Sequence, residues 1–149
     1  MTMHMETMQE MTVVCIRHIG PYGEDSRAAM ERLKSWARAK DLLESGVILG
    51  AAWDDPARTP PEQCRYDVCL ALADGSAEPE EDMLLKGIPG GHYACFKGPH
   101  TPYGVMLLWQ TSFAALAELG IVPAPDRPVL ERYRPELLEQ GLCELCIPI

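Results

Sequence analysis

Apolar and polar residues alternate at two spacings along the chain, and the first half shows the order strand, helix, strand, strand. Runs rich in β-branched and apolar residues, bounded by glycine or proline, predict strands at 13–19, 47–53 and 65–73. Between the first two strands, residues 27–40 predict a helix, because apolar side chains recur there at helical spacing. The side chains expected on its buried face are Ala29, Met30, Leu33, Trp36 and Ala37.

The same order of patterns recurs in the second half of the chain. The tripeptide Pro-Tyr-Gly at 21–23 returns at 102–104, and the strand acid Asp67 corresponds to Glu144. These landmarks keep their order, so the chain carries a diverged internal repeat. The elements predicted for this half are strands at 92–97, 129–134 and 142–149, and an apolar helix at 105–119.

The repeat predicts how the chain divides. We expect a flexible tail over 1–12 and a single domain over 13–149, made of a first module at about 13–74, a linker at about 75–87 and a second module at about 88–149. Modules of this size would be marginally stable alone, so we expect them to pair. The predicted fold class is α+β: a pseudo-two-fold pair of strand-helix-strand-strand modules with antiparallel sheets and a central ligand pocket, since such seams often hold ligands.

Charge and hydropathy then exclude several classes of partner. The 149 residues contain 13 Lys and Arg against 22 Asp and Glu, a net charge of −9, which argues against direct nucleic-acid binding and against an anionic membrane surface. No run approaches the roughly 18 apolar residues of a membrane span, and the N-terminus lacks a signal-peptide pattern. We expect a cytoplasmic protein whose six cysteines are small buried apolar residues.

Three acids interrupt otherwise apolar predicted strands: Asp67, Glu131 and Glu144. A buried carboxylate is costly unless it is hydrogen-bonded or paired, so each needs an explanation. One interpretation is that these strand faces are solvated, as one side of an antiparallel sheet often is. The other is that the acids belong to a ligand site, and strand alternation then places Glu131 and Tyr133 on one face. Arg65 is a candidate ion-pair partner for Asp67.

Aromatic residues lie near these acids in the sequence. A carboxylate among aromatic faces suits an organic cation or a polarised aromatic ligand, although packing in the core is the alternative for each ring. Met106 is flexible and would suit an adaptable binding surface. The aromatic candidates for a pocket wall are Trp53, Tyr66, Tyr103, Trp109 and Tyr133.

Motifs for metal, phosphate or nucleophilic chemistry are weak. Cys143 and Cys146 have the spacing of a metal pair, but positions three apart on a strand face opposite sides. The methionine-rich start with His4 could hold a soft ion such as Cu(I), but nothing fixes a ligand geometry. No phosphate-binding loop or nucleophile elbow is present. We expect no metal and no cofactor.

Five segments together resemble the GyrI-like effector-binding domain. That family includes the DNA gyrase inhibitor proteins and the C-terminal ligand domains of AraC-type and BmrR-type multidrug regulators. The resemblance covers 13–149. The segments are 16–24 (IRHIGPYGE), 51–72 (AAWDDPARTPPEQCRYDVCLAL), 88–99 (IPGGHYACFKGP), 130–133 (LERY) and 144–149 (ELCIPI).

The resemblance implies a pocket between the modules that accepts flat hydrophobic and often cationic molecules. It implies that Glu131 is the pocket glutamate and that Glu144 is a second acid on the last strand. Some stand-alone members are similar to hydrolases of cyclopropane-bearing cytotoxins, which would make Glu131 a catalytic base. The aromatic partners that it implies are Tyr133, Trp53, Tyr66 and Tyr103.

These observations favour a stand-alone small-molecule-binding protein that sequesters hydrophobic, possibly cationic, compounds. The few residues before the first predicted strand leave no room for a helix-turn-helix. One alternative is a hydrolase that detoxifies electrophilic cyclopropane-type cytotoxins, with Glu131 as base. Another is an interaction protein that restrains DNA gyrase. The oligomeric state stays open. The residues expected to contact the ligand are Glu131, Glu144, Tyr133, Trp53, Tyr66, Asp67, Tyr103, Met106 and Trp109.

Overall fold

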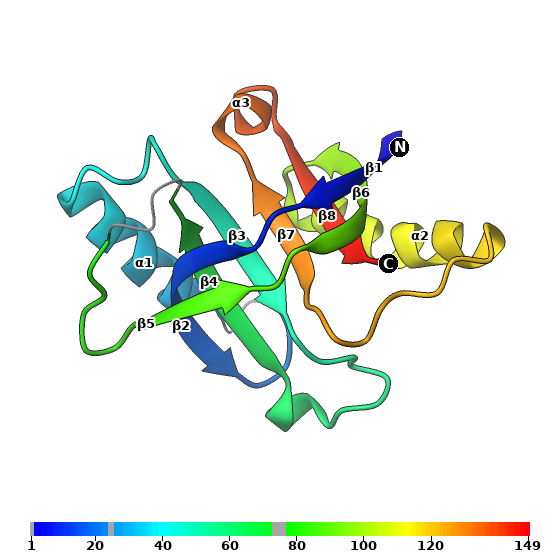
Figure 1. The fold of residues 1–149 in the computed structure, drawn as a ribbon, viewed down its shortest axis with the longest axis horizontal. Helices are drawn as coiled ribbons and strands as arrows, with labels where there is room; N and C mark the ends of the chain where they lie inside the picture. The colour runs from blue at the N-terminus through cyan, green and yellow to red at the C-terminus, as the bar shows by residue number, and fades with distance from the viewer. Residues whose placement is uncertain (1, 24–25, 73–76) are drawn as a thin grey trace.

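The computed structural model describes residues 2–23, 26–72 and 77–149. In these segments a single antiparallel sheet has the strand order β1-β6-β8-β7-β3-β4-β2-β5 and curls into a half-barrel (Figure 1). The strands are β1 (Thr2–Met8), β2 (Met11–Ile19), β3 (Val47–Ala52), β4 (Arg65–Ala71), β5 (Leu84–Ile88), β6 (Gly91–Pro99), β7 (Val129–Tyr133) and β8 (Leu142–Pro148). The helices are α1 (Arg27–Ala39), α2 (Pro102–Glu118) and α3 (Pro135–Leu138), with a 3₁₀ turn at Pro61–Gln63.

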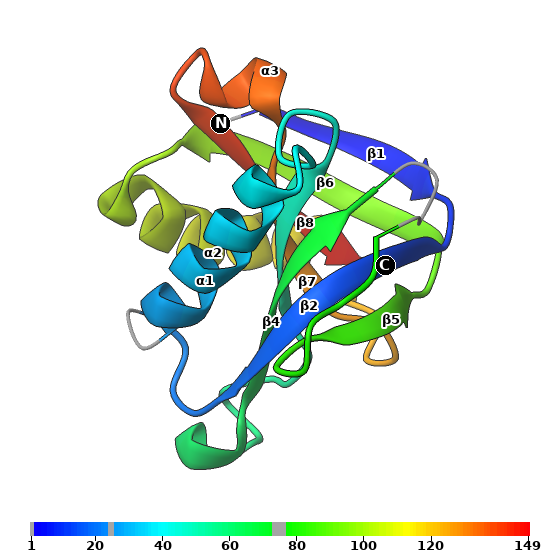
Figure 2. The same cartoon turned by 90° about the vertical axis from the view of Figure 1, so that its left-hand side faces the viewer.

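The two predicted modules are visible in the order of the strands. The triplet β2, β3 and β4 forms one half of the sheet, β6, β7 and β8 form the other, and β3 pairs with β7 at the seam. Helix α1 packs on β2 and β4, whereas α2 packs on β6 and β8. Figure 2 shows both long helices on the same side of the sheet. The predicted α+β fold class is therefore confirmed.

The N-terminal segment corrects the expectation of a flexible tail over 1–12. Thr2–Met8 forms β1, which pairs along its whole length with β6, and β2 already begins at Met11. The segment has few β-branched residues, so its own pattern does not predict a strand. Its structure comes from the open edge of β6, an example of tertiary context overriding local propensity.

The linker expected at about 75–87 also contains a strand. Leu84–Ile88 forms β5, which pairs with β2, while residues 73–76, where the module boundary was placed, lie outside the described residues. The strand before each module therefore completes the outer edge of the other module.

None of the helices in the described segments is long and apolar enough to cross a bilayer.

The two long helices are specified by different local features, a buried apolar face in α1 and an N-cap in α2. Helix α1 buries Leu33, Trp36 and Ala37 on one face, as predicted from its spacing. Helix α2 starts at Pro102 after Thr101, whose side-chain oxygen accepts a hydrogen bond from the Gly104 backbone nitrogen at 2.9 Å, the usual form of an N-cap.

Strand alternation divides the core into two faces. The helix face carries the apolar side chains that pack under α1 and α2. The opposite face, which the curled sheet encloses, carries a separate core that includes Leu49, Tyr93 and Leu130. Cys143 packs in the helix-face core and Cys146 in the enclosed core, as the alternation predicted. All six cysteines are buried.

Candidate functional site

The carboxylate of Glu131 lies on the helix face at the seam between the modules. The Tyr66 hydroxyl donates a hydrogen bond to Oε1 of Glu131, and the Trp109 indole nitrogen donates one to Oε2 at 2.8 Å. The Tyr133 hydroxyl lies 3.4 Å from Oε1. Strand β7 supplies Glu131 and Tyr133, β4 supplies Tyr66 and α2 supplies Trp109. We call these four residues the carboxylate cage.

All the hydrogen bonds to Glu131 in the described part of the chain come from neutral donors. No lysine, arginine or histidine nitrogen of these residues lies within 4.0 Å of the carboxylate. Burial, reinforced by the nearby Glu131, raises the pKa of Tyr66 and Tyr133 well above the usual tyrosine range. Both hydroxyls therefore keep their protons and remain donors. The negative charge is solvated by dipoles and not neutralised by a cation.

Gly50 on β3 makes room for the cage. A Cβ atom added at Gly50 would overlap the Tyr66 hydroxyl and lie 2.8 Å from Oε1 of Glu131. Strand β3 pairs with both β4 and β7, so this glycine lies between the strands that carry Tyr66 and Glu131. Only a residue without a side chain allows the two groups to meet there.

Further aromatic rings extend the cage. The Tyr22 ring lies 5.9 Å from Tyr66 and 6.5 Å from Trp109, measured between centroids. Phe113 stacks on Trp109 at 5.9 Å. The Tyr22 hydroxyl lies 3.0 Å from the backbone oxygens of Asp54 and Arg65, to either of which it can donate, and it accepts a hydrogen bond from the Asp54 backbone nitrogen, which fixes the ring. Sequence reasoning used Tyr22 as a landmark of the repeat and missed its place in this wall.

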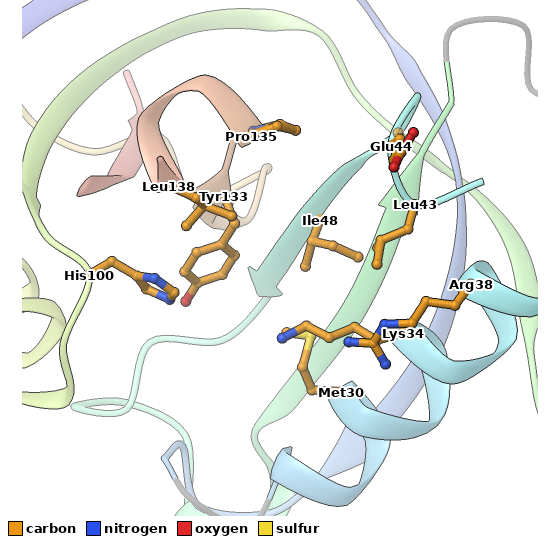
Figure 3. Close-up of a pocket in the computed structure, with 11 residues that line it drawn as sticks. Met30, Lys34, Arg38, Leu43, Glu44, Ile48, His100, Tyr133, Pro135 and Leu138 are labelled. Atoms are coloured by element: carbon orange, nitrogen blue, oxygen red, sulfur yellow. The ribbon is translucent and has the colours of Figure 1, made fainter. Parts of the chain in front are cut away.

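A cavity of about 460 Å³ lies next to the cage (Figure 3). One side is formed by α1 and the segment that leads into β3, and the other by residues of the second module. Tyr133 belongs to both the cavity wall and the cage, and its ring lies 5.3 Å from His100 between centroids. The lining residues are Met30, Lys34, Arg38, Leu43, Glu44, Gly46, Ile48, His100, Tyr133, Pro135 and Leu138.

Asp67 lies on the enclosed face, away from Glu131. It accepts hydrogen bonds from Arg17 at 2.9 and 3.0 Å, from Lys86 Nζ at 3.1 Å and from the Trp53 indole nitrogen at 2.8 Å. Burial raises the pKa of Asp67, but the bonds from Arg17 and Lys86 outweigh that effect and leave the pKa below its ordinary value. Arg65, the partner expected from the sequence, pairs instead with Asp54.

Glu144 is the corresponding acid of the second module and is also on the enclosed face. Arg132 donates to both of its oxygens, at 2.9 and 3.1 Å, and Arg134 donates to Oε1 at 2.8 Å. Arg132 also forms two hydrogen bonds with Glu6 from β1, at 2.8 and 3.0 Å. Burial raises the pKa of Glu144, but the two arginines outweigh it and hold the pKa below its ordinary value. Arg132 lowers the pKa of Glu6 to about 2.

The structure thus separates the residues that sequence reasoning grouped. It brings together Glu131, Tyr133, Tyr66 and Trp109. Trp53 joins Asp67 on the enclosed face, where Lys86 Nζ lies 4.4 Å from its ring centroid. Tyr103 and Met106, near the start of α2, are 66% and 46% exposed and line neither the cavity nor the cage. The residues found away from the cage are Asp67, Glu144, Trp53, Tyr103 and Met106.

A group of potential metal ligands occurs beside β1. Atoms of His4, Glu6 and Cys95 lie within 4.8 Å of one another. Both oxygens of Glu6 already accept hydrogen bonds from Arg132, and the guanidinium would repel a cation at that position. The group fits an ion-pair cluster better than a metal centre.

Comparisons with known proteins agree with this architecture. The chain is 33% identical over its whole length to YosT of Bacillus subtilis (strain 168), an SPbeta prophage-derived protein named as a transcriptional regulator, and covers 99% of it. It is 29% identical over 83% of its length to DNA gyrase inhibitor 2 of Dickeya dadantii (strain 3937), and the match covers 80% of that protein.

A solved structure of similar fold is that of SAV2435 bound to tetraphenylphosphonium, with a TM-score of 0.69, 15% identity, and coverage of 99% of this chain and 93% of that one. The EcmrR–DNA complex matches with a TM-score of 0.70 and 14% identity, and the match covers 99% of this chain but 56% of the EcmrR chain. The family profile described as "GyrI-like small molecule binding domain" matches residues 1–149. The chain therefore belongs to the GyrI-like small-molecule-binding domain family.

Proposed function

We propose that this domain binds hydrophobic compounds, cationic ones included, at the seam between its two modules on the helix face. The observation that carries the proposal is the Glu131 carboxylate, which neutral donors hold in place among aromatic rings beside a cavity. Asp67 and Glu144 on the enclosed face each have cations as partners, whereas Glu131 has none among the described residues.

The chemistry of the site suits such a ligand. The faces of Tyr22, Tyr66 and Trp109 attract a cation through their quadrupoles, and a partly desolvated carboxylate attracts it over a longer distance. The cavity of about 460 Å³ falls within the size range of small-molecule sites, about 300–1,000 Å³. Its apolar lining would bury the hydrophobic part of the molecule.

The solved structure of SAV2435 supports this choice of ligand class, because tetraphenylphosphonium is a lipophilic cation. At 15% identity the comparison shows a shared fold but not shared ligand contacts. The choice of site residues is therefore based on the geometry of this chain alone.

Calorimetric titration with tetraphenylphosphonium tests the proposal. Wild type should bind, and Glu131→Gln should weaken binding about tenfold or more, a loss of about 1.4 kcal/mol. Glu136→Gln, which removes an exposed acid of α3, is the matched control and should bind like wild type. Equal affinity of Glu131→Gln and wild type would remove Glu131 from the site, and no binding by wild type would contradict the proposal for this ligand class.

A second candidate is hydrolysis of electrophilic cyclopropane-type cytotoxins. It is favoured by the juxtaposition of a carboxylate that could act as base and two tyrosine hydroxyls that could donate hydrogen bonds to negative charge developing on a substrate. Turnover distinguishes it from binding. If product from a cyclopropane-bearing substrate never exceeds one equivalent of protein, this candidate is rejected for that class.

The third candidate is restraint of DNA gyrase, favoured by the name of the relative from Dickeya dadantii. The acids of this chain are spread over several elements and many are paired internally, which does not resemble a continuous array of DNA phosphates. A gyrase supercoiling assay decides: no inhibition at a large excess of this protein would remove the candidate.

A further inference from the structure

Helix α1 carries a local positive charge in an acidic protein. Residues 27–40 contain five of the 13 lysines and arginines of the chain and a single acid, Glu31. Since the net charge of the chain is −9, this segment is a place where an anion would meet less repulsion than the average charge of the chain implies.

Two of these cations, Lys34 and Arg38, line the cavity. They are four residues apart, so they lie on the same face of the helix one turn from each other. Figure 3 shows both side chains running along the cavity side of α1, with the Lys34 amine directed toward the gap that faces Tyr133 and His100. Their position results from the amphipathic pattern, which turns Leu33, Trp36 and Ala37 into the core.

Neither side chain has an ion-pair partner in the described ranges. Arg32, on the same helix, pairs with Glu80 and Asp82, whereas no acid of those ranges lies within 4.0 Å of the nitrogens of Lys34 or Arg38. Glu44 also lines the cavity but pairs with neither. Two like charges one helical turn apart repel each other, so an anion between them would relieve that repulsion.

The surroundings define what kind of anion fits. Met30, Leu43 and Ile48 line the cavity next to the two cations, and Leu138 lines the other side. An inorganic ion would leave this apolar surface uncovered, whereas a compound with an apolar body and an acid group would satisfy both parts. Carboxylate and sulfonate groups accept hydrogen bonds from guanidinium and ammonium donors with short, strong geometry.

We propose that Lys34 and Arg38 form an anion subsite, and that the cavity accepts amphipathic compounds whose carboxylate or sulfonate lies between these two side chains. This inference rests on the proposed function, because it assigns a ligand class to the same cavity. It adds to the role of Glu131: the cavity offers positive charge on its α1 side, and the carboxylate cage adjoins it through Tyr133.

Calorimetric titration with two matched compounds tests the subsite. 2-Naphthoate carries the acid, and 2-naphthalenemethanol has the same ring system without a charge. Wild type should bind 2-naphthoate more tightly than the alcohol. The double variant Lys34→Gln/Arg38→Gln should lose about tenfold in affinity for 2-naphthoate, or about 1.4 kcal/mol, and less than about twofold for the alcohol. Arg58→Gln, which changes an exposed arginine outside the cavity lining, is the control and should behave like wild type.

Thermal unfolding of the double variant checks that it folds, and the alcohol serves as an internal test of an intact cavity. Equal affinity of wild type for both compounds, or an equal loss for both in the double variant, would overturn the anion subsite. Binding of tetraphenylphosphonium without binding of either naphthalene compound would overturn the subsite and leave the proposed function standing. If wild type bound none of the three, the proposed function would fail and the subsite with it.

Discussion

Acids on the two faces of the sheet have different kinds of hydrogen-bond partner. On the enclosed face, Asp67 and Glu144 are each 1% exposed, and each is held by two basic side chains. On the helix face, Glu131 is only partly buried and is held by tyrosine and tryptophan donors. Carboxylates in strands of one sheet are thus paired with cations on one face and held by neutral donors on the other.

This difference separates structure from function. A buried ion pair with complete hydrogen bonding has no remaining capacity for a ligand, and it joins strands that lie far apart in the sequence. A carboxylate whose hydrogen bonds come from neutral donors has no internal cation as partner, which leaves it available to a cation from outside. We therefore assign Asp67 and Glu144 to folding and Glu131 to binding, and the following predictions test that division.

The largest expected effect is the loss of Arg132. Arg132→Met leaves Glu6 without its arginine and takes two hydrogen bonds from Glu144, so unfolding should become easier by about 3–5 kcal/mol, the range for breaking a buried pair. Glu131→Gln should cost only about 1 kcal/mol, because the amide oxygen can still accept from the Trp109 indole and the amide nitrogen can donate to the Tyr66 hydroxyl oxygen. Urea unfolding followed by circular dichroism measures both. Equal losses of unfolding free energy in the two variants would contradict the assignment of Glu144 to folding and Glu131 to binding.

A smaller effect is expected at Gly50, and it should fall on the helix face. Gly50→Ala puts a methyl group where the Tyr66 hydroxyl meets Glu131, so Tyr66 must move. Overpacking of this kind costs about 1–3 kcal/mol. Binding of tetraphenylphosphonium should weaken as well, whereas Arg132→Met should leave affinity unchanged under conditions where it is folded. Unchanged affinity in Gly50→Ala would show that the Tyr66–Glu131 contact is not needed for binding.

The smallest effect concerns pH and Glu6. Its pKa falls from 4.5 to about 2 in the folded protein, chiefly through the hydrogen bonds from Arg132. A depressed pKa gives stability that is present above the unfolded value and is lost as pH drops through the folded value. Stability should therefore decline between about pH 4.5 and 2, and Glu6→Gln should flatten that decline only slightly, because solvent screens the partly exposed Glu6 side chain. Urea midpoints at several pH values measure the slope, and an identical slope in the variant would contradict the assignment.

The sequence predicted the fold class, and it predicted one of the contacts around Glu131. Period-two alternation correctly placed Glu131 with Tyr133, because that inference concerns neighbours on one strand. It could not place Tyr66 beside them, since this requires β3 to lie between β4 and β7. Tyr22 reaches the cage from the turn after β2, where no periodic pattern exists to orient it.

The ion pairs of the enclosed face were beyond sequence reasoning for the same reason. Lys86 reaches Asp67 from β5, within a stretch expected to be a linker, and Glu6 reaches Arg132 from a stretch expected to be a tail. An acid in an apolar strand is therefore compatible with two kinds of partner, a cation of the same chain or a ligand. The pattern alone could not distinguish these partners, because it contains no information on which strands are neighbours.

The three tryptophans offer the most direct test of the division, because each reports on one place. Trp109 donates to Glu131, Trp53 donates to Asp67, and Trp36 is buried on the core-facing side of α1. The measurement is the shift of the indole N–H resonances in ¹⁵N-labelled protein during titration with tetraphenylphosphonium, assigned with single Trp→Phe variants. The account predicts a large shift of the Trp109 resonance and little change at Trp53. A shift at Trp53 with Trp109 unmoved would contradict it.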